Sequence, residues 1–371
     1  MNTSAGKKEV RRCVKCVLPE SLPGSSFNAQ GECSWCQSRF PNYVPEGKEK
    51  LQHLLEKNRS NIGAADCLVG VSGGKDSTFA MLELKRKFGM RVEAFTYVHD
   101  GLTDFALQNA KEACRVLDIK HHEVSLPNHA HLESFKGFFK AWVESEEPVA
   151  AAMTCVACKH LHLLGTRLAE KREIPMVVWS MCPLETPPFI PTQAKGETKA
   201  KSDGIAGLSV LLGRNIIARK KFRQAFLGNL STCVFGCLAF RPNTKYLQLR
   251  YMTVEHIYYY NFMDWNGDNI VKTLKKHTAW SVPENVVSDW HSDCFFNVFK
   301  EYMFQKMLGA SYTDAFLSNQ IRHGCITREE GWSELIRSKA YYSEELFKAL
   351  SSLGLEELRS KCDVSCFKIV R

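Results

Sequence analysis

Between positions 66 and 180 the chain alternates between short apolar runs and longer segments in which apolar residues recur at helical spacing. The apolar runs have the length of buried strands and are bounded by turn residues, so they predict β-strands. They lie at 67–71, 91–98, 122–126 and 174–180. The segments between them predict helices, at 78–85, 103–117 and 161–171. Strands that alternate with helices indicate an α/β fold, with a parallel sheet flanked by helices.

The most specific feature is the hexapeptide Ser-Gly-Gly-Lys-Asp-Ser at 72–77, between the first predicted strand and its helix. A tight glycine turn there directs backbone N–H groups and a helix N-terminus toward one point, which suits phosphate. We expect both glycines to supply positive φ angles and a close backbone approach. The lysine adds a positive charge, and the serines add hydroxyl donors. The predicted phosphate-binding residues are Ser72, Gly73, Gly74, Lys75, Asp76 and Ser77.

This hexapeptide resembles the pyrophosphatase loop, or PP-loop, of ATP pyrophosphatases, which have an adenine nucleotide alpha hydrolase-like fold. The resemblance implies an enzyme that cleaves ATP between its α- and β-phosphates and places AMP on a substrate oxygen. A nitrogen or sulfur nucleophile then replaces AMP. It also implies ATP and Mg²⁺ as cofactors and a catalytic role for Lys75 and Asp76, with the metal neutralising the developing charge.

His99 and Asp100 follow the second predicted strand. Ligands of parallel sheets bind at the carboxyl ends of the strands, so we expect both residues, and the segment 180–185, to lie near the nucleotide. Either side chain is suited to nucleotide contact or to proton transfer. The alternative is that each has only local partners in its loop.

The chain has 15 cysteines, and four of them form two Cys-x-x-Cys pairs near the N-terminus. They are Cys13, Cys16, Cys33 and Cys36, with 16 residues between the pairs. This spacing predicts a zinc ribbon, in which each pair gives two thiolates to one tetrahedral Zn²⁺. A segment this short needs a metal because it cannot bury a core of its own. An iron–sulfur cluster is the alternative.

A further pair, Cys155 and Cys158, precedes a predicted helix. We expect thiols at a helix N-terminus to have a lowered pKa and to be reactive or metal-binding. Three functional alternatives stay open: ligands of a cluster, redox or persulfide-carrying thiols, and a second zinc site. The structural alternative is packing in the core. Candidates for a further ligand are Cys182, Cys233, Cys237 and Cys294.

Composition limits the partners and the compartment. The 371 residues carry a net charge of +9, which suits phosphate-bearing ligands such as nucleotides, nucleotide sugars and RNA without choosing among them. No apolar stretch approaches the roughly 20 residues that span a bilayer. Residues 1–12 are polar and basic, without the apolar core of a secretory signal. We therefore expect a cytoplasmic protein with no membrane span.

Several motifs together resemble the N-acetyl sugar amidotransferases of bacterial surface-polysaccharide synthesis. They are the cysteine segment 13–36, the loop at 72–77, Ser-Asp-Cys at 292–294 and Ile-Arg-His-Gly-Cys-Ile-Thr-Arg-Glu-Glu at 321–330. The resemblance implies adenylation of an acyl oxygen on a small-molecule sugar substrate. Ammonia from a separate glutaminase subunit then gives an amidine. This chain departs from the family after Ser180, where Met-Cys-Pro-Leu-Glu stands in place of Gly-Glu, so its substrate can differ.

The pair Cys155 and Cys158 also resembles the Cys-x-x-Cys of PP-loop tRNA sulfurtransferases, which hold a [4Fe–4S] cluster with three cysteines. This implies the alternative function of ATP-dependent sulfur insertion into a carbonyl of a nucleobase, tRNA or other small molecule, with a sulfur-donor protein as partner. Nucleic acid is the less favoured substrate. A third hypothesis is a nucleotide-binding regulator that has lost the chemistry.

These patterns divide the chain into predicted parts. They are a four-cysteine zinc ribbon at 1–45, a PP-loop ATP-pyrophosphatase domain at 60–190, a basic flexible insertion at 191–245 and a mainly helical C-terminal region at 246–371. Residues 195–223 carry eight Lys or Arg residues and two acids, which is typical of a mobile cover or a polyanion contact, with a solvated surface insertion as the alternative. In the C-terminal region, Thr327 and Glu330 predict a helix capping box, and Arg322 and Arg328 are suited to phosphate or carboxylate.

Overall fold

The computed structural model describes residues 10–38, 43–61, 65–185, 205–284, 286, 290 and 292–369. The chain divides into two compact units. The helical unit consists of Met1–Tyr43, Leu184–Leu208 and Val298–Arg371, and the sheet unit consists of Val44–Pro183 and Ser209–Asn297. Among the described residues, no helix has both the length and the apolar character needed to cross a membrane.

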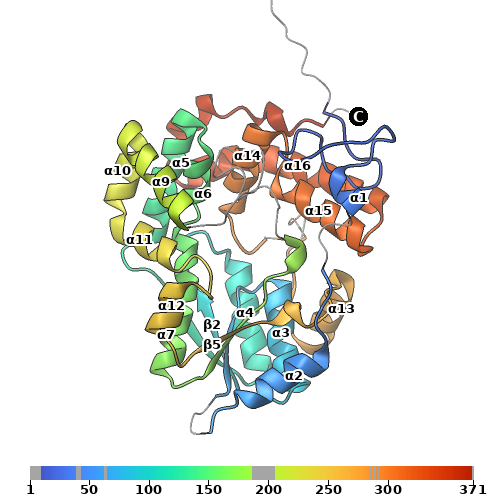
Figure 1. The fold of residues 1–371 in the computed structure, drawn as a ribbon, viewed down its shortest axis with the longest axis vertical. Helices are drawn as coiled ribbons and strands as arrows, with labels where there is room; N and C mark the ends of the chain where they lie inside the picture. The colour runs from blue at the N-terminus through green and yellow to red at the C-terminus, as the bar shows by residue number, and fades with distance from the viewer. Residues whose placement is uncertain are drawn as a thin grey trace, which may run out of the picture. The chain divides into compact units, whose positions relative to one another are not determined.

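The sheet unit is built on five parallel strands in the order β3-β2-β1-β4-β5 (Figure 1). They are β1 (Cys67–Gly70), β2 (Val92–Tyr97), β3 (Lys120–Val124), β4 (Met176–Trp179) and β5 (Glu255–Tyr258). Because β1 is central and the chain adds strands first on one side of it and then on the other, the order reverses between β1 and β4. Ligands of open α/β sheets bind at such a reversal.

Helices cover the sheet as the sequence predicts. Helices α3 (Lys75–Arg86) and α4 (Asp104–Val116) contact β1, β2 and β3, whereas α7 (His160–Lys171) contacts β1, β2 and β4. In Figure 1, α3 and α4 lie on one side of the strands and α7 on the other. Buried apolar side chains of the strands and of α7 form the core, among them Leu68, Phe95 and Val177. The predicted α/β fold class is confirmed.

Strand β5 lies in a segment whose aromatic-rich pattern predicted helix. It pairs in parallel with β4, with Met176 opposite Glu255 and Trp179 opposite Tyr258. Without β5, the outer backbone groups of β4 would have no strand partner, although β4 is buried along its whole length. The pairing across the chain, rather than the local pattern, therefore decides the structure of this segment.

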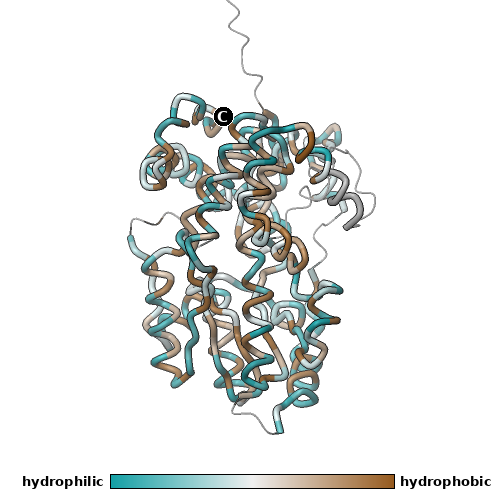
Figure 2. The backbone as a smooth tube through the Cα atoms, turned by 90° about the vertical axis from the view of Figure 1, so that its left-hand side faces the viewer, coloured by the Kyte–Doolittle hydropathy of each residue, from teal (hydrophilic) through white to brown (hydrophobic). Residues whose placement is uncertain are grey.

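Further helices complete the sheet unit. They are α2 (Lys48–Lys57), α5 (Ala130–Ser145), α6 (Pro148–Met153), α10 (Lys220–Gly228), α11 (Leu230–Leu238), α12 (Lys245–Arg250) and α13 (Gly267–His277), while α9 (Ile205–Ala218) spans the division between the units. Within the predicted basic insertion, residues 191–204 lie outside the described residues, and α9, α10 and α11 follow them. Hydrophobic and hydrophilic residues are interleaved along the helices (Figure 2), so a helix can turn an apolar side to its neighbours.

The helical unit confirms the predicted helical C-terminal part. Its helices are α1 (Ser34–Ser38), α14 (Asn297–Leu308, beginning at the unit boundary), α15 (Tyr312–His323) and α16 (Arg328–Ser352). The predicted capping box begins α16, because Glu330 N donates to Thr327 Oγ1 at 3.2 Å and Thr327 N donates to Glu330 Oε2 at 2.7 Å. The cysteine segment packs its Leu18 and Leu22 with Phe304 and Ala315 in one apolar cluster.

Candidate functional site

The phosphate-binding sequence lies at the carboxyl end of the central strand. The loop at 72–77 leaves β1, turns, and enters α3, whose first residue is Lys75. Parallel neighbours flank β1 on both sides, so this loop lies at the reversal of strand order. The tertiary structure thus brings the predicted loop to the position at which sheets of this kind bind nucleotides.

Gly73 and Gly74 have different roles in the turn. Gly73 has a φ of +83°, and a Cβ atom there would lie 1.8 Å from the backbone oxygen of Ala106 in α4. A side chain at Gly73 is therefore excluded by both conformation and space. Gly74 has a φ of −67°, which any residue can adopt, so the predicted positive φ at Gly74 is wrong. It lies at the N-cap of α3 and takes an extended conformation there.

Hydrogen bonds within the loop hold its shape. Ser77 Oγ accepts a hydrogen bond from Ser72 N at 3.2 Å and lies 3.2 Å from the carbonyl oxygen of Gly74. Gly74 N donates to Ser72 Oγ at 3.3 Å. The two serine hydroxyls therefore contact the loop itself, which organises the turn before any ligand binds.

Aromatic residues after β5 hold the charged residues of the loop. Trp265 Nε1 donates to Asp76 Oδ1 at 2.8 Å, and the Tyr260 hydroxyl donates to the Asp76 carbonyl at 3.2 Å. The Lys75 side chain is buried, with its Nζ 5.8 Å from the centre of the Trp265 ring. No local pattern points to these aromatic residues, because they are about 190 positions away from the loop along the chain.

A second long-range contact fixes Gly73. Trp280 Nε1 donates to the Gly73 carbonyl at 2.9 Å. Asn109 of α4 donates through Nδ2 to the carbonyl oxygen of Ser281 at 2.7 Å, and the same nitrogen is 3.5 Å from the Gly73 carbonyl. These contacts orient the Gly73 peptide so that its carbonyl faces the protein.

A carboxylate from the Ser-Asp-Cys motif lies beside the loop. A Cβ atom on Gly74 would be 3.6 Å from Asp293 Oδ2. The motif is held by the turn after β2, where Thr103 N donates to the Asp293 carbonyl at 3.0 Å and Leu102 forms a bridge with Cys294. From the sequence, this motif was singled out only as part of a family resemblance, and Asp293 was not predicted as a site residue.

The two residues predicted after β2 point to different partners. Gly101 N donates to His99 Nδ1 at 3.1 Å, and the His99 ring stacks on His131 with 4.3 Å between ring centres. Burial lowers the pKa of His99 to about 4, so its ring is neutral at pH 7. Asp100 instead pairs with Nδ1 of the exposed His129. Their predicted nucleotide contacts stay a prediction.

The thiol of Cys158 belongs to a partly buried hydrogen-bonded chain. Tyr97 donates its hydroxyl proton to the Ala157 carbonyl at 3.2 Å, so its oxygen accepts from His131 Nδ1 at 3.1 Å. This assigns His131 Nε2 as the acceptor for the Cys158 thiol, 3.4 Å away. Burial lowers the pKa of His131 to about 2, which keeps the ring neutral.

The predicted lowering of the thiol pKa is wrong for Cys158. The neighbouring Cys155 thiol and burial raise the pKa of Cys158, and Cys294 adds to the effect. Cys158 lies in a short 3₁₀ turn (Ala157–Lys159), where the Cys155 thiol and burial disfavour its thiolate form. At neutral pH this side chain is a thiol.

Of the four candidates for a further ligand beside Cys155 and Cys158, Cys294 contributes to the raised pKa of Cys158, after the Cys155 thiol and burial. Cys233 and Cys237 lie on α11, where burial and then the Cys237 thiol raise the pKa of Cys233, and Cys182 is buried after β4. In the part of the chain that the structure describes, these thiols form no group of three with ligand atoms within 4.8 Å of one another. A second metal or cluster site stays a prediction.

The N-terminal cysteines form the compact group that their spacing predicts. The Sγ atoms of Cys13, Cys16, Cys33 and Cys36 lie within 4.8 Å of one another. Cys13 Sγ is 3.7 Å from Cys36 Sγ, and Cys16 Sγ is 3.8 Å from Cys33 Sγ. A tetrahedral ion with Zn–S bonds of about 2.3 Å has sulfurs about 3.8 Å apart. The group therefore fits one tetrahedral ion.

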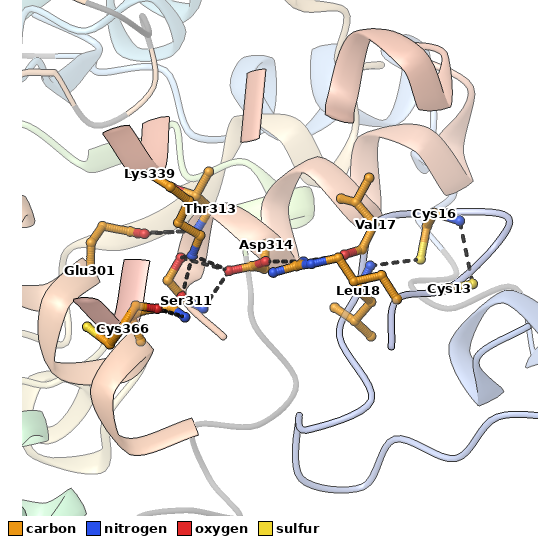
Figure 3. A network of polar contacts seen from close by, with 12 residues as sticks. Cys13, Cys16, Val17, Leu18, Glu301, Ser311, Thr313, Asp314, Lys339 and Cys366 are labelled. Atoms are coloured by element: carbon orange, nitrogen blue, oxygen red, sulfur yellow. Dashed lines mark hydrogen bonds and ion pairs between the residues drawn. The ribbon is translucent and has the colours of Figure 1, made fainter. Parts of the chain in front are cut away.

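The two C-terminal arginines are engaged near this cysteine group. Arg322 donates to Cys16 Sγ at 3.3 Å, and Arg328 donates to the carbonyl oxygens of Cys16 and Cys13 at 3.1 and 3.3 Å. Both arginines contact the cysteine segment, and their suitability for phosphate or carboxylate stays a prediction. Figure 3 shows Cys13 and Cys16 beside the polar network of Asp314 in the same unit.

Comparison with known proteins gives weak similarities only. No family model and no curated protein matches the sequence. The fold is similar to an NMN synthetase from Francisella tularensis, at 14% identity and a TM-score of 0.35, over 81% of this chain and 93% of the other.

Two further solved structures give matches of the same kind. An NH3-dependent NAD synthetase from Campylobacter jejuni matches at 15% identity and a TM-score of 0.27, over 64% of this chain and 96% of the other. A U34-tRNA thiolase from Methanococcus maripaludis with its [4Fe-4S] cluster matches at 14% identity and a TM-score of 0.31, over 85% of this chain and 86% of the other. These similarities assign the chain to no family.

Proposed function

We propose that this protein is an ATP-dependent PP-loop enzyme that adenylates an oxygen of a small-molecule substrate, releases pyrophosphate and then replaces AMP with nitrogen. The observation that carries the adenylation step is the loop at 72–77, which turns through Gly73 at the carboxyl end of the central strand and opens α3. Backbone N–H groups and a helix N-terminus at this place suit the phosphates of ATP.

In the proposed first step the substrate oxygen attacks the α-phosphorus of ATP. The bond from that phosphorus to the oxygen bridging the α- and β-phosphates breaks, and pyrophosphate leaves on the loop, where Lys75 supplies a positive charge. Asp293 supports a role for Mg²⁺, because a carboxylate next to the loop would repel the polyphosphate unless a divalent cation lay between them. Asp76 and Asp293 are the residues proposed to hold this cation.

In the proposed second step ammonia attacks the carbon of the adenylated amide. The bond between that carbon and the adenylated oxygen breaks, AMP leaves, and loss of a proton gives the amidine. The choice of an N-acetyl sugar and of nitrogen is supported by the motif resemblance at 13–36 and 321–330. A separate glutaminase subunit is the proposed source of ammonia.

Isotope transfer tests the adenylation step. The protein is incubated with ATP, ammonium and a series of N-acetylated nucleotide sugars that carry ¹⁸O in the acetamide carbonyl. We expect pyrophosphate release that depends on the acceptor, with ¹⁸O recovered in the phosphate of AMP. Pyrophosphate release without an acceptor, or AMP without ¹⁸O from an accepted sugar, would contradict the proposal.

A second candidate function, sulfur transfer, is favoured by the contact of Cys158 with His131 and by the nearby thiols of Cys155 and Cys294. In this alternative, sulfide takes the place of ammonia in the second step and the product is a thiocarbonyl. A competition between ¹⁵N-ammonium and ³⁴S-sulfide separates the two. Product that contains ³⁴S and never ¹⁵N would sink the nitrogen proposal, and product that contains ¹⁵N and never ³⁴S would sink the sulfur proposal.

A further inference from the structure

The C-terminal segment 321–330 takes no part in the chemistry proposed above, yet it contacts the cysteine group of the helical unit. We propose that Cys13, Cys16, Cys33 and Cys36 bind one Zn²⁺, and that Arg322 is a positioning residue that sets the affinity of this site through its contact with the Cys16 sulfur. Arg328 has the related role of holding the backbone of the first cysteine pair.

Charge balance is the first argument for Arg322. Four thiolates around one Zn²⁺ carry a net charge of −2. Cys13, Cys16 and Cys33 are fully buried, so this charge is largely removed from water and needs positive partners. Among the described residues, Arg322 is the cation whose side chain donates to a sulfur of the group, at 3.3 Å.

The Arg322 guanidinium is also held from behind. It donates to the side-chain oxygen of Asn319 one turn earlier in α15. Asn319 is itself fully buried and donates through Nδ2 to the carbonyl oxygen of Leu184 at 2.6 Å. Because Asn319 is buried and hydrogen-bonded, it holds the Arg322 guanidinium toward Cys16. Metal binding then costs Arg322 little side-chain entropy.

Arg328 fixes the other side of the first cysteine pair. Its Nε and Nη2 atoms donate to the carbonyls of Cys16 and Cys13, at 3.1 and 3.3 Å. Its side chain lies over the ring of Trp332, 5.8 Å from the ring centre. This orients the pair so that its N–H groups face sulfur, as in the 3.5 Å contact from Cys16 N to Cys13 Sγ.

The segment 321–330 is therefore shaped to present two arginines at one place. Arg322 lies in the last turn of α15 and Arg328 is the first residue of α16, with Gly324 at a φ of +75° turning the chain between them. The contacting residues are more than 300 positions apart along the sequence, so the contacts exist only in the folded unit.

The test uses the full chain and reads metal binding rather than turnover. Arg322→Gln removes the charge, and Arg322→Lys keeps the charge without the planar guanidinium. Arg337→Gln is the matched control, because Arg337 is exposed on α16 and its ion pair is with Glu334 of the same helix. For each variant, Zn²⁺ per chain and Zn²⁺ affinity are measured by competition with a chelator. The Co²⁺-substituted protein reports the thiolate-to-metal absorption band.

We expect one Zn²⁺ per chain in the parent and in Arg337→Gln, and an affinity about 10- to 100-fold weaker in Arg322→Gln. Arg322→Lys should recover most of the affinity, and the Co²⁺ band should move in Arg322→Gln but not in the control. Equal affinities and Co²⁺ spectra for all variants would overturn the role of Arg322. Absence of Zn²⁺ from the parent would overturn the site. If Arg322→Gln does not fold, Arg322→Lys decides the role of the positive charge. A Zn²⁺ affinity equal to that of the parent supports this role, and a Zn²⁺ affinity about 100-fold weaker contradicts it.

Discussion

At the scale of single residues, Gly73 shows how one position shapes the loop. Its φ of +83° and the 1.8 Å approach of the Ala106 oxygen leave no room for a side chain. Gly89 also has a positive φ, +60°, but a Cβ atom there would meet nothing within 4 Å. Substitution of Gly89 by alanine therefore has only the free-energy cost of the backbone conformation, whereas substitution of Gly73 also has the cost of a steric clash.

The variant Gly73→Ala should lose ATP binding and acceptor-dependent pyrophosphate release, because the new Cβ would force the loop away from α4. The matched variant Gly89→Ala carries only the conformational cost of about 1–2 kcal/mol and should keep its activity. Nucleotide binding by calorimetry and pyrophosphate release check both. Normal ATP affinity in a folded Gly73→Ala protein would show that the loop does not hold the phosphates.

Cys158 allows a prediction about pH. Since Cys155 and burial raise the pKa of Cys158, its thiolate fraction at pH 7 is smaller than that of an ordinary cysteine, and it grows only in alkaline solution. Alkylation by iodoacetamide at pH 7, followed by peptide mass spectrometry, should be at least about tenfold slower at Cys158 than in the denatured protein. The rate should climb steadily above pH 9. Labelling at the denatured rate at pH 7 would mean that the thiolate is already present.

At the scale of elements, helix α15 is anchored by an acid at its N-terminus. Asp314 accepts from Ser311 N at 2.8 Å, and it pairs with Lys339 of α16 and Arg12 of the cysteine segment, each at 2.5 Å. Burial alone would raise the pKa of Asp314, but the charges of Lys339 and Arg12 hold it below its usual range. One carboxylate thus connects three elements of the helical unit (Figure 3).

The variant Asp314→Asn should lower the free energy of unfolding by about 3–5 kcal/mol at pH 7, because it leaves Lys339 buried without its counter-charge. A lowered carboxyl pKa contributes stability above the unfolded value of about 3.9, and this is lost as the pH falls below it. The parent should therefore lose stability below about pH 4 more steeply than the variant. Urea denaturation at pH 7 and pH 3 measures both effects.

The exposed acid Glu344 of α16 provides the control, since Glu344→Gln removes a carboxylate without removing a buried partner. We expect a change within about 0.5 kcal/mol for this variant. If Asp314→Asn were no less stable than Glu344→Gln, the buried pair would not anchor α15.

At the scale of the whole molecule, the two candidate sites belong to different units. The loop and its aromatic and acidic partners lie in the sheet unit, whereas the four cysteines and their arginines lie in the helical unit. The metal proposed for the cysteines would connect the N-terminal segment to α15 and α16, so its contribution to stability should be confined to that unit.

Removal of the metal tests this division. After chelation, amide hydrogen exchange should increase in residues 10–38 and around 321–330, while α3, α4 and the strands of the sheet keep their protection. Exchange is followed by mass spectrometry of peptides, with Zn²⁺ added back to show reversal. Equal loss of protection in both units, or none in either, would contradict a metal role local to the helical unit.

Features that depend on neighbouring residues could be predicted from the sequence. The strand–loop–helix around 72–77, the alternation that predicts the parallel sheet, the capping box at Thr327 and the two cysteine pairs are all local patterns. The structure has each of them, because strand length, glycine conformation and helix capping are set within a few residues.

Contacts between distant residues could not be predicted from the sequence and were found in the folded chain. Residues 255–258 form strand β5 because they pair with β4. Asp293 lies beside the loop because the turn after β2 binds its backbone. The Cys155 thiol and burial raised the pKa of Cys158 where a lowered pKa was expected, and Arg322 of α15 donates to the sulfur of Cys16. Burial, charge pairing and strand pairing act between residues tens to hundreds of positions apart, so no local pattern contains them.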